Sequence, residues 1–469
     1  MVSVAADIGM GSAAPSVPQQ RHRRGLITLL ALAAVALTIA VSGVVFSEPA
    51  PVDALTMGLI VLLPVIGLVH FTPTLVSFAA LWLLAATGAL LGMAFSQDLS
   101  GTGIHVAVTL YLYAACAVLA AFVAYDPPRH ARLLLNAWSF AALVAASAAL
   151  LGYFHIIPGG YELFTEYGRA TGTFKDPNVF APFLIVPLLY LINVALERPL
   201  RGMVLPLALA AILTLGVFFS FSRGAWINLA LSLALYGYLL LVTTRKARVR
   251  LKLLSLLLLG ALFAALAVMA ALSSNEISSL LLQRASFDQS YDLGEEGRFG
   301  GQEKALGMIA EKPLGIGALE FGQRYHPEAA HNVYLTMFLN SGWLGGGTYL
   351  LLVLLSLVFG MRFAMRGTEI RPMFLAVYAA FVGTAGEGII IDSDHWRHFY
   401  VLMALLWGMM AAEYSSSGRA IVAGDGAKPD KRNARGRRAP RLLASADEGK
   451  GPAKPRRLPT IVGAQVPAT

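Results

Sequence analysis

Long apolar runs constrain this chain more than any other feature of its sequence. Hydrophobic residues make up 57% of its 469 residues and charged residues 13%. A soluble domain carries about 25% charged residues, and it has no way to bury so many continuous apolar runs. A run of roughly 20 apolar residues is long enough to cross a bilayer as a helix. The sequence therefore predicts an all-α polytopic membrane protein of about 12 transmembrane helices, with one large loop that contains short helices.

The apolar runs divide the chain into a membrane domain and two polar ends. The predicted spans are 25–47, 52–70, 75–95, 103–124, 132–154, 179–196, 203–220, 225–243, 252–273, 332–360, 372–391 and 397–414. They form a transmembrane domain over residues 21–414, which the large loop of residues 274–330 interrupts. Residues 1–20 and 415–469 lack apolar periodicity and cannot bury enough surface to fold, so both ends are expected to be disordered.

The distribution of Lys and Arg predicts the orientation of the spans. If the N-terminus is cytoplasmic and the spans alternate, most short-loop cations fall on the cytoplasmic side. These are Arg21, Arg23, Arg24, Arg129, Arg132, Arg198, Arg201, Arg245, Lys246, Arg248, Arg250, Lys252, Arg362, Arg366 and Arg371. The short loops of the other side hold Arg169, Lys175, Arg223 and Arg397. Because the positive-inside rule counts short loops, both ends are expected in the cytoplasm and the 274–330 loop outside.

The two ends of the chain carry basic residues that allow more than one interpretation. Arg21 to Arg24 before an apolar run resemble a signal peptide, but the run exceeds the usual core of about 7–15 residues, which favours an uncleaved span. The basic tail either contacts anionic lipid headgroups or keeps the chain soluble and fixes its topology. Membrane lipids are expected partners of the protein. Nucleic-acid binding is not expected, because no aromatic or fold signal accompanies the charge.

Two short segments predicted on the outer face carry cations next to helix starts. Residues 167–178 hold Arg169 and Lys175, and they end in Asp-Pro-Asn, a typical helix start. Residues 219–224 join two spans with almost no loop, so Arg223 is expected at the membrane surface. An arginine there either serves a functional site or extends to lipid phosphate.

The large loop brings arginines and a histidine together. Arg298 precedes a helix-like run of residues 302–312, and Pro313 ends it. The glycines that follow do not form a dinucleotide fingerprint, since no strand precedes them. The chain re-enters the membrane at His331, and although a lone histidine is more often structural, its side chain is the best suited to proton transfer near neutral pH. Arginines bind phosphates in a bidentate way, so the loop predicts chemistry on a lipid-linked phosphate.

Residues 392–398 form a further polar segment on the predicted outer face. Their two carboxylates and two histidines offer ligands for a divalent cation, although the spacing is not specific. Trp396 and Arg397 fit an interfacial anchor equally well. Glu387, close to this segment, is a candidate to pair with one of the arginines. The favoured interpretation places no metal here.

The order of these motifs carries a family resemblance. The matching residues, between about 165 and 400, are Arg169, Gly172, Thr173, Phe174, Asp176, Pro177, Asn178, Ser222, Arg223, Gly224, Arg298, Pro313, Gly315, Gly317, His331, Asn332, Tyr334, Gly342 and Gly345. Together they resemble the O-antigen ligase and polymerase family. That family includes lipopolysaccharide O-antigen ligases, O-antigen and exopolysaccharide polymerases and some protein O-oligosaccharyltransferases. The spans before about residue 165 resemble that family only in being apolar membrane spans.

The resemblance implies a reaction and a set of residues for it. The donor would be a glycan on undecaprenyl diphosphate at the periplasmic face of a bacterial inner membrane, and the transfer would be inverting, without metal or cofactor. His331 would be the general base that takes the proton from an acceptor sugar hydroxyl. Arg223 and Arg298 would stabilise the diphosphate leaving group, which needs positive charge more than a proton donor. The implied substrate-binding residues are Arg169, Lys175, Asn332 and Tyr334.

The motifs leave the acceptor open. It is either a lipid A-core sugar, as in a ligase, or a growing polysaccharide, as in a polymerase, with the ligase slightly favoured. Other polysaccharide assembly proteins are candidate partners. A twelve-span transporter is the remaining alternative. It would place ionisable residues along a path through the spans, whereas the polar residues of this chain gather on one face.

Overall fold

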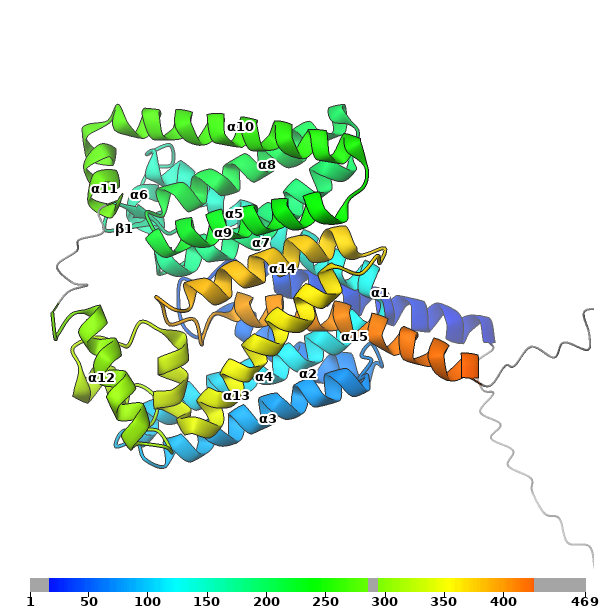
Figure 1. Ribbon diagram of the computed structural model, residues 1–469, viewed down its shortest axis with the longest axis horizontal. Helices are drawn as coiled ribbons and strands as arrows, with labels where there is room; N and C mark the ends of the chain where they lie inside the picture. Colours follow the sequence, from blue (N-terminus) through cyan, green and yellow to red (C-terminus); the bar gives the residue numbers. More distant parts are fainter. Residues whose placement is uncertain (1–16, 286–293, 426–469) are drawn as a thin grey trace, which may run out of the picture. The chain divides into compact units, whose positions relative to one another are not determined.

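Each predicted span falls on a helix in the computed structural model, which describes residues 17–285 and 294–425 (Figure 1). The helices are α1 (Val17–Val41), α2 (Pro51–Val65), α3 (Pro73–Met93), α4 (Leu99–Tyr125), α5 (Pro127–Tyr153), α7 (Pro177–Glu197), α8 (Leu200–Phe219), α9 (Arg223–Thr243), α10 (Ala247–Leu272), α13 (Val333–Ala364), α14 (Arg371–Glu387) and α15 (Arg397–Asp425). Among the described residues, 8 of them are long and apolar enough to cross a membrane: α3, α4, α5, α7, α8, α9, α10 and α13. The helical membrane character is therefore confirmed, and the total of about 12 spans stays a prediction.

Proline and a capping oxygen together set where several helices begin. Asp176 precedes α7, and its Oδ1 accepts a hydrogen bond from the N–H of Asn178 at 2.7 Å. Thr72 does the same for α3, accepting from the N–H of Leu75 at 3.3 Å. The next residue in both cases is a proline, whose missing N–H is not needed at the first helical position. The Asp-Pro-Asn sequence is thus a helix cap, as expected.

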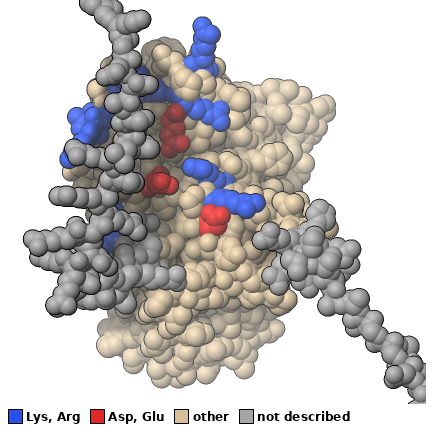
Figure 2. All heavy atoms as spheres, turned by 90° about the vertical axis from the view of Figure 1, so that its right-hand side faces the viewer, with Lys and Arg blue, Asp and Glu red and all other residues tan. Residues whose placement is uncertain are grey.

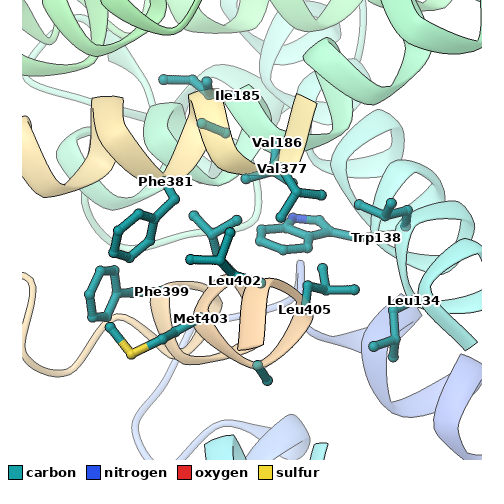
Figure 3. Close-up of a cluster of buried hydrophobic side chains, with 14 of the residues drawn as sticks. Leu134, Trp138, Ile185, Val186, Val377, Phe381, Phe399, Leu402, Met403 and Leu405 are labelled. Carbon is teal, nitrogen blue, oxygen red and sulfur yellow. The ribbon is translucent and has the colours of Figure 1, made fainter. Parts of the chain in front are cut away.

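The helices pack in long pairs around an aromatic and aliphatic core. α3 lies along α13, α7 along α8, and α9 along α14. Figure 3 shows side chains of α14 and α15 meeting those of α5 and α7. Trp138, Val186, Phe381, Leu402 and Leu405 are almost fully buried there. This core fixes α15 and the segment before it, on which the site described below depends.

α10 shows the opposite pattern, with its apolar side chains on the surface. Leu251 and Leu258 are 67% and 74% exposed, and α10 has the highest hydropathy of the candidate spans. In water such a helix would be a large exposed apolar patch, which soluble monomers rarely have. A bilayer removes that cost, so the exposed face of α10 supports a membrane environment.

Basic connections lie together at one end of the helices. The connections α4–α5, α7–α8, α9–α10 and α13–α14 and the start of α1 are on the right in Figure 1, and α11 and α12 are at the opposite end. Figure 2 views the right-hand face and shows Lys and Arg gathered on it. That the basic face is cytoplasmic stays a prediction.

The large predicted loop contains short helices, as expected. They are α11 (Asn275–Ala285), α12 (Arg298–Glu311) and a single π-helical turn, Phe321–Tyr325. Residues 286–293 of the loop lie outside the described residues. α12 begins at Arg298, four residues before the predicted run, so Arg298 is part of the helix. The side of the membrane on which the loop lies stays a prediction.

Small departures from the predicted all-α chain occur between α5 and α7 and at both ends. α6 (Gly160–Phe164) leads into β1 (Thr165–Glu166), which pairs antiparallel with β2 (Arg169–Ala170). α1 already begins inside the end predicted to be disordered, and α15 continues past residue 414. The rest of both predicted disordered ends, 1–16 and 426–469, lies outside the described residues. The chain divides into units 1–419 and 420–469, and the site lies within the first.

Candidate functional site

A cavity of about 740 Å³ gathers the predicted catalytic residues. Arg169, Lys175, Arg223, Arg298 and His331 all line it. Its apolar lining comes from α1, α2, α4 and α5, with Ile39, Leu59, Leu112, Leu119 and Trp138. Small-molecule sites usually enclose about 300–1,000 Å³. The cavity therefore joins a charged region, which also holds carboxylates such as Glu387 and Asp392, to an apolar one.

Two of the cations stand at the starts of helices. Arg223 is the first residue of α9, where Ser222 Oγ accepts from the N–H of Ala225 at 3.4 Å, and Arg298 is the first residue of α12. The first turns of both helices, described in full, hold no Asp or Glu. A helix start carries partial positive charge, so an arginine there is unfavourable unless an anion binds nearby. Both helix starts therefore bring positive charge to the wall of the cavity.

Arg169 has a mainly structural environment. It is 8% exposed, and its Nε donates to the carbonyl of Ser220 at 2.8 Å. Its Nη2 donates to Asn178 Oδ1 at 2.7 Å. These bonds connect β2, the start of α7 and the α8–α9 turn. Arg169 therefore holds in place the turn that presents Arg223.

A carboxylate from a distant segment fixes the backbone at His331. This residue has φ of +47°, a left-handed conformation that is costly for a residue with a side chain. Asp392, in the connection between α14 and α15, accepts from the N–H of His331 at 3.0 Å and of Asn332 at 3.2 Å. The Thr336 hydroxyl also donates to Asp392, at 2.5 Å. Asp392 thus acts as a clamp on the turn that presents the histidine.

Glu328 orients the imidazole of His331. Its Oε2 lies 3.2 Å from His331 Nε2. Donation of the Nε2 proton to this carboxylate leaves Nδ1 with the free lone pair. The carboxylate also stabilises the imidazolium that forms when the histidine accepts a proton. Sequence reasoning missed Glu328, for which the only signal was its position three residues before His331.

The other two predicted substrate-binding residues lie outside the lining that the described residues form. Asn332 caps α13, and its Oδ1 accepts from the N–H groups of Tyr334 and Leu335 at 3.1 and 3.3 Å. The Tyr334 hydroxyl donates to the carbonyl of Ala385 at 2.6 Å. Both side chains therefore have structural partners, and their role in substrate binding stays a prediction.

Glu387 places a buried carboxyl group in the cavity wall. It is 4% exposed, and Asn228 Nδ2 donates to its Oε2 at 2.7 Å. Its Oε1 has no hydrogen-bond partner among the described residues. A Cβ at Gly224 would lie 2.9 Å from that oxygen, so only a glycine next to Arg223 leaves the space open. Glu387 therefore places a buried carboxyl group directly beside the start of α9.

The two aspartates of segment 392–398 have different hydrogen-bond partners, although their charges interact. Asp392 is occupied by the His331 turn, as described above. Asp394 Oδ2 lies 3.4 Å from His105 Nε2 of α4. Burial alone would raise the pKa of Asp394, but the imidazoles of His105 and His395 beside it lower it to about 2. His398 packs between aromatic rings away from both.

A glycine in α13 receives the returning loop. Gly342 has φ of +64° and ψ of −169°, which interrupts the helix. The N–H of Trp343 donates to the carbonyl of Pro313 at 2.8 Å. A Cβ at Gly342 would lie 2.6 Å from that carbonyl oxygen, so a larger residue has no room. The Pro-x-Gly-x-Gly and Gly342 motifs are therefore two sides of one contact.

Glu320 attaches the large loop to the turn between α3 and α4. Its Oε1 accepts from Ser96 Oγ at 2.8 Å and from the N–H groups of Gln97 and Asp98 at 2.7 and 3.2 Å. Its Oε2 lies 2.8 Å from Arg324 Nε. The carboxylate is 3% exposed. Sequence reasoning missed this attachment, because its partners are far apart along the chain.

We expect Glu320→Gln to loosen the loop in a pH-dependent way. Burial raises the pKa of Glu320, but the bonds from Ser96, Gln97 and Asp98 and the charge of Arg324 outweigh it, so the pKa is lowered. The carboxylate therefore stabilises the loop above its unfolded pKa of about 4.3 and loses this effect as the pH falls through its lower folded pKa. The substitution should cost about 1–3 kcal/mol at neutral pH.

Hydrogen exchange of residues 294–330 in nanodiscs measures this effect. Protection should fall at pH 7 in Glu320→Gln and hardly change in Glu311→Gln, a surface carboxylate at the end of α12. The difference between Glu320→Gln and the native chain should shrink toward pH 3. Equal protection of the native and Glu320→Gln loops at pH 7 would contradict the attachment.

The fold and the cavity define a helical membrane protein with a cationic site bordered by a histidine. Residues 208–350 match the family model described as O-Antigen ligase, which confirms the resemblance over that part of the chain. Arg223, Arg298 and His331 lie inside the match, and Arg169 and Lys175 precede it. The match identifies a membrane enzyme of glycosyltransferase type without separating ligase from polymerase. No curated protein matches the chain.

Proposed function

We propose that this protein moves a glycan from undecaprenyl diphosphate to a hydroxyl of an acceptor sugar, at the periplasmic face of the inner membrane. The observation that carries the proposal is the cavity, which collects Arg223, Arg298 and His331 from three separate segments. The apolar lining from α1, α2 and α4 suits the start of a polyprenyl chain. The O-antigen ligase match supports the same class of substrate.

The residues divide the reaction between them. His331 takes the proton of the acceptor hydroxyl, and the resulting oxygen attacks the anomeric carbon of the donor glycan. The new glycosidic bond forms as the bond to the diphosphate breaks, and undecaprenyl diphosphate leaves with the electron pair. Attack from the face opposite the leaving group inverts the anomeric carbon. Arg223 and Arg298 stabilise the charge that develops on the diphosphate.

Deleting the gene tests this function and identifies the acceptor. Undecaprenyl diphosphate-linked glycan should accumulate, and the mature surface glycan should be lost. A ligase predicts that polymer is still built but is not attached to its core, whereas a polymerase predicts single repeats only. Unchanged surface glycan with no accumulated lipid-linked glycan would contradict both.

We expect Asp392→Ala to impair catalysis through His331. Without the clamp, two backbone N–H groups of the turn at His331 lose their carboxylate acceptor, and a displaced base costs about 10²-fold in rate. The loss should fall on kcat, with the KM for the donor nearly unchanged, since the arginines stay in place. Asp392→Asn, which keeps an acceptor oxygen, should recover part of the rate. Steady-state transfer assays on purified variants measure both values.

The control is Glu369→Ala, which removes an exposed carboxylate from the connection between α13 and α14. It should transfer glycan at the native rate. A native kcat in a folded Asp392→Ala protein would show that the clamp is not needed for catalysis.

A further inference from the structure

We propose that His105, Asp394 and His395 bind a transition-metal cation of the Zn²⁺ type. His105 comes from α4, and the other two come from the connection between α14 and α15. One ligand atom from each residue lies within 4.8 Å of the others. Two imidazoles and a carboxylate are a common donor set for zinc, with a fourth position left for water. Nitrogen donors favour such a cation over Mg²⁺ or Ca²⁺.

The imidazoles of His105 and His395 both lie close to the Asp394 carboxylate. The rings of His105 and His395 lie 3.9 Å apart at an angle of 27°. His105 Nε2 is 3.4 Å from Asp394 Oδ2, which is long for a direct hydrogen bond. A cation between these atoms would draw the ligands together, whereas a simple ion pair would use only one of the two histidines.

Hydrogen bonds outside the cluster fix its tautomer. The Thr109 hydroxyl donates to the carbonyl of His105 at 3.0 Å, so its oxygen is free to accept. His395 Nε2 lies 2.9 Å from this oxygen and therefore carries the proton. This leaves His395 Nδ1 with the lone pair that a cation needs. Histidine ligands of metals are typically held through their second nitrogen in this way.

Asp394 is also held from outside the cluster. The Tyr400 hydroxyl donates to its main-chain carbonyl at 2.6 Å, and the residue is 7% exposed. The ligands thus sit on a rigid helix and on a segment anchored to α15, and a preformed site favours metal binding.

The cation would join α4 to the segment that carries Asp392. Because Asp392 clamps the His331 turn, the metal would stabilise the wall of the active cavity, which Asp394 and His395 also line. Its role is structural, and the arginines still supply the positive charge for the reaction. The inference rests on the geometry of three side chains and does not depend on the proposed function.

The site is tested by measuring the metal content of the whole protein. The protein is purified without a histidine tag and reconstituted in nanodiscs. After stripping with a chelator, Zn²⁺ should rebind at one per chain and raise the thermal midpoint. Co²⁺ should give the absorption bands of a tetrahedral nitrogen and oxygen site. His105→Ala and His395→Ala should each weaken Zn²⁺ binding by about 100-fold or more, beyond the loss expected for an outer-shell partner.

His70→Ala is the matched control, because His70 is an exposed histidine in the connection between α2 and α3. It should bind Zn²⁺ like the native chain. The site is overturned if the native protein binds no stoichiometric Zn²⁺ or Co²⁺, a measurement that does not depend on the folding of any variant. It is also overturned if both substitutions leave Zn²⁺ binding unchanged. None of these readouts uses a glycan, so their failure is distinct from failure of the proposed function.

Discussion

His331→Ala is expected to lower the rate of glycan transfer by about 10²–10⁴-fold, the usual contribution of a general base. The Glu328 carboxylate, 3.2 Å from His331 Nε2, stabilises the imidazolium that this proton transfer forms. The donor should still bind, because Arg223 and Arg298 are untouched. The measurement is kcat with a lipid-linked donor in proteoliposomes, together with the affinity for undecaprenyl diphosphate.

The matched control is His155→Ala, an exposed histidine just after α5. It should keep the native rate. Glu328→Gln should have an intermediate effect and shift the pH profile of kcat, because an amide stabilises the imidazolium less than a carboxylate does. A stably inserted His331→Ala protein with native kcat would remove the histidine from the mechanism.

Arg223→Ala and Arg298→Ala should each lower kcat/KM by about 10²–10³-fold, as the loss of one group that stabilises transition-state charge commonly does. Each substitution removes a cation at a helix start facing the cavity. Lysine at either position should restore only part of the activity, because it cannot form the planar bidentate contact of arginine. Transfer kinetics and titration with undecaprenyl diphosphate measure the two effects.

Arg129→Ala serves as the control, since Arg129 lies at the start of α5 on the opposite, basic face. It should bind the donor normally. If both arginine variants bound undecaprenyl diphosphate with native affinity and transferred glycan at the native rate, the cavity would not be the diphosphate site.

The helices could be predicted because apolar length is written directly in the sequence. Their ends and the number of spans could not. Residues 388–391 are mostly apolar and were included in a predicted span, but the structure ends α14 at Glu387. The next residues form a turn whose carbonyls, at Gly388 and Ile391, accept from the N–H of Val333. Hydropathy does not distinguish an apolar turn from a helix, because both bury the same side chains.

The candidate site was predictable where one side chain has distinctive chemistry. Arg223, Arg298 and His331 stand out in an apolar chain, and the structure places all three around one cavity. Their supporting groups did not stand out, because their partners meet only in the folded protein. Asp392 is 61 residues from His331, and Glu320 is 224 residues from Ser96. An acidic residue in a loop has no sequence signature for such a contact.

Reconstitution with defined substrates tests the central claim most directly. The purified protein would be placed in liposomes with an undecaprenyl diphosphate-linked glycan and an acceptor glycan, without any nucleotide sugar. The native protein should release undecaprenyl diphosphate in equal amount to a new glycosidic bond of inverted anomeric configuration, and His331→Ala should form neither. Equal turnover by His331→Ala, or transfer only when a nucleotide sugar is supplied, would contradict the account.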